Sequence, residues 1–380
     1  MKTNYVLLVC ALLGCTSFGA ADRTTLLTKA FYNQGKLSDK IVLYFDKEPL
    51  CNQLPVRPNL KQTETKVEIT LILPLVSIGS DAKNAVHKIN KIKHDGYSIS
   101  VSHVDLPVKG IRVLISYNPE LVTLDYSTCD VISAQKGLVI SFHDKRMLEK
   151  IKQASNPILR YASVDNRPKK KIVIDYGHGG SDNGTIGCHH LKEKDVTLQV
   201  GKKVVALLKE KGFDVSVTRD RDCFVALDQR TSAANNQEAD LFVSIHANSG
   251  ISKEAQGVET HWTPRSLLHK KIDAAAASCR DILELWYANL DKQTHLLAQC
   301  VHKNLIHTVH YQYADVIDRG TKKSNAQVLI GTDMPSALIE IGFLSHKAEA
   351  ARLGENGYQT LIATGICKGI EAYCKQVPMS

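Results

Sequence analysis

Residues 172–180 read IVIDYGHGG, an apolar strand that runs directly into a glycine-rich turn. After it, apolar runs with the period of a strand alternate with runs that have the period of a helix. They predict a helix at 195–208, a strand at 215–218, a helix at 227–235 and strands at 241–245 and 337–341. Such alternation indicates a mostly parallel sheet with helices on both faces. Residues 172–375 are therefore expected to form an α/β domain, which ends in a helix with an apolar face between Leu361 and Tyr373.

The N-terminal half has a different pattern. Between residues 40 and 145, short runs rich in β-branched residues alternate with turn residues, which predicts a small β-rich domain. Its sequence has no clustered acids, bases or metal ligands. Residues 163–171 are polar and basic and include Pro168, as is typical of a linker. The predicted organisation is a β-rich domain at 22–160, a linker at 161–171 and the α/β domain at 172–375.

Residues 1–21 have the layout of a secretory signal peptide, with Lys2, an apolar run at 6–13 and small residues up to Ala21. The apolar run is too short for a permanent membrane span, and no later run reaches the ~18 apolar residues that a span needs. The sequence from Leu12 to Cys15 resembles a lipobox and leaves open a lipid anchor at Cys15. We therefore expect an exported protein of the periplasm or cell envelope, with no integral membrane span in the mature chain.

The chain has 48 basic and 39 acidic residues, a formal net charge of +9. An excess of this size suits an anionic polymer or an envelope surface, and it would also suit a nucleic acid. However, no motif that reads RNA or DNA accompanies it, and lysines scattered along helices usually form a solvated face. A nucleic-acid partner also conflicts with the export signal and is not expected.

Three metal-binding side chains occur where a parallel sheet would bring them together. His178 follows the first strand of the α/β domain, His246 ends the strand at 241–245, and Glu193 opens the helix between them. Functional sites of such sheets lie beyond the carboxyl ends of the strands. Each residue alone would be unremarkable, as part of a turn, as a structural histidine and as a first-turn charge. Together, two histidines and a glutamate are a standard set of protein ligands for catalytic Zn²⁺, with a fourth position left to water.

Glu340 lies inside an otherwise apolar strand, Ala337 to Ile341. Burying a charged carboxylate there is costly without a partner. A nearby metal and its water would supply one and would make Glu340 a general base. The alternative is a core glutamate that pairs with Arg319 or Lys322.

Residues 171–375 resemble the zinc-dependent N-acetylmuramoyl-L-alanine amidases of the type 3 family. The motifs that carry the resemblance are, in chain order, Asp175 to Gly180, Glu193-Lys194-Asp195, Ser244 to Asn248, Gly257 to Thr260, Arg319 to Lys322 and Pro335 to Phe343. The resemblance implies hydrolysis of the amide bond between the lactyl group of N-acetylmuramic acid and the L-alanine of the peptidoglycan stem peptide. Such an enzyme would act in cell wall remodelling or daughter cell separation.

By the same resemblance, zinc is bound by His178, Glu193 and His246, and Glu340 is the catalytic carboxylate that takes the proton from the zinc-activated water. The β-rich region is similar to the AMIN domains that precede such amidases and localise them in the envelope, which implies wall targeting.

Other polar residues are expected to support the ligands or to contact the substrate. Asp175 is a candidate acceptor for a hydrogen bond from His178, and the remaining candidates are Arg319, Lys322 and Asn248. A departure from the family pattern, Cys188-His189-His190, leaves open a carboxypeptidase-like site made of His190, Glu193 and His246. A catalytically dead wall-binding module is a further alternative, which the intact set of ligands and base disfavours.

Residues 279–290 show apolar residues at helical spacing and predict an amphipathic helix. Some amidases of the family carry a helix here that blocks the zinc site through a glutamate until a protein activator displaces it. Glu284 is the only glutamate between Glu259 and Glu340 and is therefore the candidate autoinhibitory residue. The alternative is a helix that only covers the edge of the sheet.

Overall fold

The structure is a computed structural model of the whole chain. It describes residues 25–33, 38–45, 59–62, 66–74, 76–92, 94–104, 110–130, 136–146, 170–264, 271–272 and 277–377. The predicted signal peptide, Cys15 and all but the last two residues of the predicted linker lie outside these ranges.

The C-terminal half is built on a six-stranded sheet. In spatial order its strands are β11 (Asp214–Val217), β10 (Lys171–Tyr176), β12 (Leu241–Asn248), β16 (Ser336–Phe343), β13 (Val258–Trp262) and β15 (Asp318–Lys323). The first four run parallel, as predicted. The sequence did not predict β13 and β15, which run antiparallel to β16 and make the sheet mixed.

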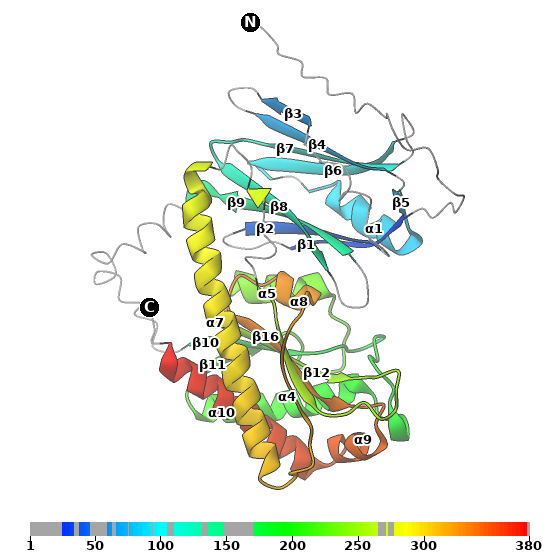
Figure 1. The fold of residues 1–380 in the computed structure, drawn as a ribbon, viewed down its shortest axis with the longest axis vertical. Helices are drawn as coiled ribbons and strands as arrows, with labels where there is room; N and C mark the ends of the chain where they lie inside the picture. The colour runs from blue at the N-terminus through cyan, green and yellow to red at the C-terminus, as the bar shows by residue number, and fades with distance from the viewer. Residues whose placement is uncertain are drawn as a thin grey trace, which may run out of the picture.

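Helices cover both faces of this sheet, which confirms the α/β prediction (Figure 1). One face packs against α4 (Glu193–Glu210), α7 (Ala277–His310) and α10 (Asn356–Gln376). The other face packs against α5 (Leu227–Asn236) and α8 (Gln327–Ile330). The larger core lies on the α4 side, where Val196, Val200 and Val204 follow one another at helical spacing and are fully buried. A short helix, α9 (Lys347–Leu353), follows β16.

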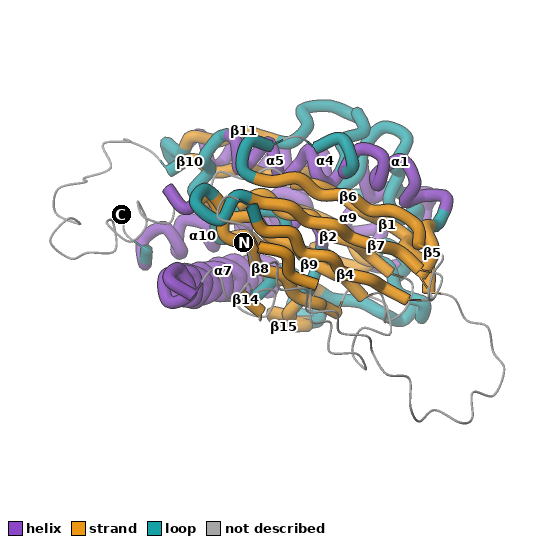
Figure 2. Tube along the Cα trace, turned by 90° about the horizontal axis from the view of Figure 1, so that it is seen from above, coloured by secondary structure: helices purple, strands orange, loops and turns teal. Residues whose placement is uncertain are grey.

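Two further sheets, with α1 (Ser80–Ile89), occupy the N-terminal half (Figure 2). One contains β5 (Val76–Ile78), β1 (Thr25–Asn33), β2 (Ser38–Phe45), β9 (Lys136–Asp144) and β8 (Val122–Asp130). The other contains β3 (Asn59–Gln62), β4 (Val67–Pro74), β7 (Gly110–Tyr117) and β6 (Tyr97–Val104). Apolar side chains from both sheets and α1 share one core. β2, β4, β6, β7 and β9 lie at the β-branched runs between residues 40 and 145, whereas β1, β3, β5 and β8 were not predicted. The bounds 22–160 of a separate domain stay a prediction.

The two halves are joined at several points. Residues Lys271–Ile272 form a short strand, β14, that pairs with β8 and extends the N-terminal sheet. Nζ of Lys40 on β2 lies 2.7 Å from Oδ1 of Asp333, and both side chains are buried. The hydroxyl of Tyr287 on α7 lies 3.1 Å from Nε2 of His143 on β9.

α7 differs from the expected helix at 279–290. It is one continuous helix of 34 residues that runs from the N-terminal strands along the side of the molecule (Figure 1). Among the described helices, none combines the length and the apolar character that a membrane span requires.

Candidate metal centre

The turn after β10 places His178 at the end of the strand. The backbone of His178 has φ of 61°, in the left-handed region that costs energy for a residue with a side chain. Two contacts hold it there: Nη2 of Arg230 donates to the His178 carbonyl at 2.7 Å, and the neighbouring Gly179 exchanges backbone hydrogen bonds with Asp182. Gly177 leaves room for a second imidazole, because a Cβ at this position would lie 2.5 Å from the ring of His246.

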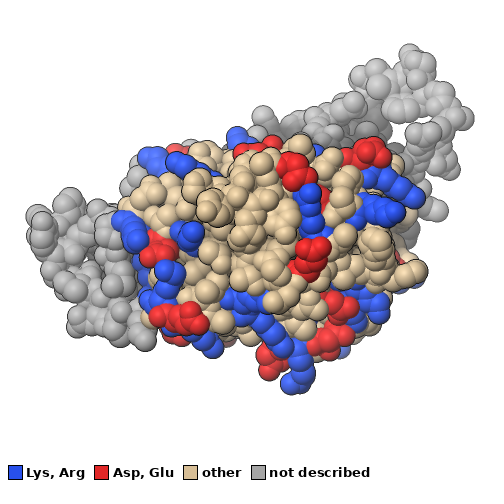
Figure 3. Space-filling view, turned by 90° about the horizontal axis from the view of Figure 1, so that it is seen from below, with Lys and Arg blue, Asp and Glu red and all other residues tan. Residues whose placement is uncertain are grey.

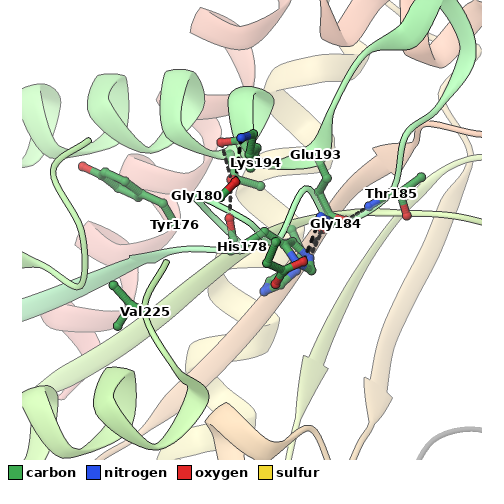
Figure 4. A network of polar contacts seen from close by, with 12 residues as sticks. Tyr176, His178, Gly180, Gly184, Thr185, Glu193, Lys194 and Val225 are labelled. Carbon is green, nitrogen blue, oxygen red and sulfur yellow. Dashed lines mark hydrogen bonds and ion pairs between the residues drawn. The ribbon is translucent and has the colours of Figure 1, made fainter. Parts of the chain in front are cut away.

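His178, Glu193 and His246 meet in one cluster, and Figure 4 shows His178 and Glu193 pointing toward one another. Oε1 of Glu193 lies 3.1 Å from Nε2 of His178 and 2.9 Å from Nδ1 of His246. The three possible ligand atoms all lie within 4.8 Å of one another. The structure thus brings together the three residues that the sequence predicts as metal ligands.

Glu193 is the buried centre of this cluster. Its Oε1 also accepts from the backbone N–H of Ala247, and its Oε2 accepts from that of Thr185 at 3.0 Å. Burial raises the pKa of Glu193, but hydrogen bonds from His178 and His246 outweigh this effect and hold the pKa well below its usual range. The carboxylate is therefore ionised, as a metal ligand must be.

A tight loop closes over the cluster. Gly184 has φ of 62°, and a Cβ there would lie 2.6 Å from both Oε2 of Glu193 and Cδ2 of His178. A side chain at this position would collide with the cluster, so the backbone can pass this close only at a glycine. The space left beside the three side chains is therefore small. A buried, ionised carboxylate between two imidazoles fits a bound divalent cation, and the donor set is the one that zinc enzymes use.

Asp182 contacts the cluster, and the sequence interpretation did not single it out. Its Oδ2 lies 2.8 Å from Nδ1 of His178, and its Oδ1 accepts from the N–H of Gly184 at 3.0 Å. It sits four residues after His178 in the same turn. An aspartate four residues after a candidate ligand, in the turn sequence Asp-Asn-Gly, is the pattern by which the sequence could have identified this contact.

Asp175 does not take the place that the sequence assigned to it. It is fully buried and accepts hydrogen bonds from Arg230 at 2.7 Å and from Thr218 and Ser244 at 2.6 Å. Its side chain therefore contacts Arg230 rather than the ring of His178, and Arg230 in turn holds the His178 carbonyl. The expected direct contact is wrong, because the strand turns Asp175 into the core while the ring lies beyond the strand end.

Glu340 lies on β16 beside the cluster. In the sheet it is the register partner of His246 on β12 and of Glu259 on β13. Its Oε2 is buried and has no hydrogen-bond partner among the described residues. Burial, together with the charges of Glu193 and Glu259, raises the pKa of Glu340 well above its ordinary value. A carboxyl group in this position can hold and release a proton.

The alternative pairing of Glu340 with Arg319 or Lys322 is wrong. Both cations contact Glu259 instead: Nε of Arg319 lies 2.7 Å and Nζ of Lys322 lies 2.5 Å from Oε2. Asn248 also contacts Glu259, through Oε1 at 3.0 Å. Three of the predicted supporting residues therefore gather on a carboxylate that the sequence interpretation did not single out, because the antiparallel strand β13 was not predicted.

The remaining predicted residues lie away from the cluster. His189 and His190 form a short 3₁₀ helix with Cys188 and are exposed. Within the described ranges, the only group of side chains found able to hold a metal is His178, Glu193 and His246, which argues against a site that uses His190. Glu284 is exposed on α7, in the part of that helix where Tyr287 contacts β9. Blocking the cluster through Glu284 would require α7 to rearrange.

Comparisons with known proteins place these features in a family. Residues 172–372, more than half of the chain, match the family model described as N-acetylmuramoyl-L-alanine amidase. The uncharacterized protein YqiI of Bacillus subtilis is 34% identical over 207 residues, which are 54% of this chain and 86% of that protein. The N-acetylmuramoyl-L-alanine amidase AmiA of Escherichia coli is 28% identical over 249 residues, covering 58% of this chain and 84% of the relative. A solved structure, the N-acetylmuramoyl-L-alanine amidase AmiC2 of Nostoc punctiforme, is 32% identical with a TM-score of 0.44, over 54% of this chain and 97% of that one.

Proposed function

The chain belongs to the N-acetylmuramoyl-L-alanine amidase family, and we propose that it is a zinc enzyme in which Glu340 is the general base. Its substrate is peptidoglycan, and the bond cleaved is the amide between the lactyl group of N-acetylmuramic acid and the L-alanine of the stem peptide. The single observation that carries the mechanism is the cluster of His178, Glu193 and His246 beside Glu340, whose Oε2 has no hydrogen-bond partner among the described residues.

His178, Glu193 and His246 would hold the zinc ion. When bound there, zinc lowers the pKa of a water ligand to about 7 and polarises the carbonyl of the substrate. Two imidazoles and one carboxylate are a donor set that catalytic zinc sites use, which supports zinc as the proposed ion.

Glu340 would move the proton. Its Oε2 has no partner among the described residues and is free to accept the proton of the attacking water. The carboxyl would then hold that proton until the amide bond breaks, when it passes to the nitrogen of L-alanine. The products are a free lactyl carboxylate and a peptide with a free amino terminus.

Asp182 and Arg230 would position His178. Asp182 accepts a hydrogen bond from Nδ1, which keeps the proton on that nitrogen and directs the lone pair of Nε2 toward the cluster. Arg230, fixed by Asp175, holds the strained backbone of the turn through the His178 carbonyl. The ring is thereby held in position before any metal binds.

The N-terminal half would direct the enzyme to the wall as an AMIN-like domain. The described part of this half offers two sheets with a shared core and contains no metal-binding group, which suits a binding role. The proposal includes export to the periplasm or cell envelope through residues 1–21, with a lipid anchor at Cys15 left open. It also includes a role in wall remodelling or daughter cell separation and a protein activator as partner.

A nucleic-acid partner is not part of the proposal. Figure 3 shows the surface seen from below, where basic and acidic side chains are mixed around an uncharged centre. Such a mixed surface does not favour binding of a nucleic acid.

Digestion of purified peptidoglycan tests the activity and the metal together. The enzyme should release peptides that begin with L-alanine and should leave unsubstituted lactyl groups, both identified by mass spectrometry. A chelator should stop the reaction, and added Zn²⁺ should restore it. Wall binding without released peptides would instead identify a dead binding module, and release of peptides cut at another bond would identify a peptidase.

A further inference from the structure

Two cations share one carboxylate at the edge of the candidate site. Arg319 and Lys322 on β15 both donate to Oε2 of Glu259, while Asn248 and His261 lie 3.0 Å from Oε1. A carboxylate has about four acceptor sites, so these four donors saturate Glu259. Two cations therefore contact one carboxylate.

Each cation keeps donors that Glu259 does not use. Arg319 donates from Nε to Glu259 and from Nη1 to the Gln256 carbonyl at 3.3 Å, and its Nη2 donates to no residue among those that the structure describes. The ammonium of Lys322 has three hydrogens, of which the contact with Glu259 uses one. Both side chains are partly exposed, at 33% and 39%. Unused donors of both cations therefore reach solvent.

The guanidinium of Arg319 is held by contacts on several sides. The guanidinium of Arg319 lies over the ring of Phe343, with Cζ 4.9 Å from the ring centre. The ring contacts one face of the planar group, and Glu259 and Gln256 accept hydrogen bonds at its edge. A fixed donor loses little conformational entropy on binding, which favours recognition of a ligand over a purely solvated role.

The cluster also lies beside the proposed base. Glu340 sits between His246 on β12 and Glu259 on β13 in the register of the sheet, so the spare donors are one strand beyond Glu259. Any substrate held with its amide bond at Glu340 would extend a short way over this edge.

We propose that Arg319 and Lys322 form an anion subsite that binds the α-carboxylate of the residue that follows the L-alanine in the stem peptide. This inference rests on the proposed function and adds a preference for an acidic residue at the second position of the stem peptide, directly after the L-alanine. A planar carboxylate suits the pair, since a guanidinium and an ammonium can each donate to one of its oxygens.

Two substrates that differ only in charge test the subsite: N-acetylmuramoyl-L-alanyl-D-glutamate and the same compound with its α-carboxylate converted to an amide. The zinc-loaded enzyme should show a KM roughly tenfold lower for the acid, as expected for one charge-assisted hydrogen bond. In Lys322→Gln and Arg319→Gln the ratio of the two KM values should fall toward one. Lys322→Arg, which keeps the charge, should retain the preference.

Lys323→Gln is the matched control, because Lys323 is a cation of the same strand that lies over Trp262 rather than on Glu259. It should keep the wild-type ratio. Equal KM values for the two substrates in the wild type would overturn the subsite. A rise in KM in Lys322→Gln that is the same for both substrates would also overturn it, because Lys322 would then only hold Glu259 in place. Dissociation constants measured by calorimetry report binding of the two compounds independently of cleavage. Failure to cleave either compound would count against the proposed function. Equal dissociation constants for both would count against the subsite.

Discussion

Asp182 accepts a hydrogen bond from Nδ1 of His178 at 2.8 Å, within the same turn that brings His178 to the cluster. Asp182→Asn should therefore weaken zinc binding roughly 10- to 100-fold, because the partner that fixes the ring and its tautomer is altered. Competition with a chelator of known affinity measures the change. Asp220→Asn, an exposed residue that faces Arg221, is the control and should bind zinc as the wild type does. Equal affinity in both variants would show that Asp182 does not position the ring.

Glu340→Gln should separate metal binding from chemistry. The variant should lose roughly 10²- to 10⁴-fold in kcat, the usual contribution of a general base. Because Glu340 is not one of the three clustered ligands, zinc content by atomic emission should stay at about one ion per chain. In His178→Ala and His246→Ala both metal and activity should be lost. Loss of zinc in Glu340→Gln would assign this residue to the ligands instead.

Asp175 should make the fold sensitive to acid. Burial raises its pKa, but the charge of Arg230 and hydrogen bonds from Ser244, Thr218 and Arg230 outweigh this, so the pKa in the folded protein is lowered. The carboxylate therefore stabilises the fold above its unfolded pKa of about 3.9, and this contribution is lost as the pH falls through the lower folded value.

Urea unfolding of the metal-free protein, measured across acidic pH, checks this expectation. The free energy of unfolding should fall more steeply with acid in the wild type than in Asp175→Asn, which should also be less stable at pH 7 by roughly 3–5 kcal/mol. The exposed Asp220→Asn should keep the wild-type slope. Parallel slopes in all three proteins would mean that Asp175 is not ionised in the fold.

The buried ion pair between the two halves should contribute strongly to stability. Lys40→Met leaves Asp333 without this partner and should lower the free energy of unfolding by roughly 3–5 kcal/mol. The double variant with Asp333→Leu should recover part of the loss. Lys66→Met removes a more exposed pair with Glu68 and should cost about 1 kcal/mol or less. Similar melting temperatures for Lys40→Met and Lys66→Met would contradict a buried link.

The sequence was sufficient for the residues that sit at the ends of parallel strands. His178 and His246 each follow an apolar run, and a parallel sheet necessarily brings such positions to one edge. Glu193 could be placed because it opens the helix that packs beside them. Local pattern and fold class together determine these positions.

The contacts of Asp182 and Glu259 could not be predicted in the same way. Asp182 reaches His178 only because the turn folds back through residues with positive φ. Glu259 meets Glu340 only through the register of an antiparallel strand that follows a loop of irregular sequence. Such contacts depend on the path of the chain between elements, which periodicity does not reveal.

The buried pair of Lys40 and Asp333, with the strand that residues 271–272 add to β8, bears on how this protein can evolve. An N-terminal half with an uncharged residue in place of Lys40 would leave the Asp333 carboxylate buried without this cation. Such an exchange would therefore lower the stability of the chain. In descendants of this chain, residues 40 and 333 should be inherited together or replaced together.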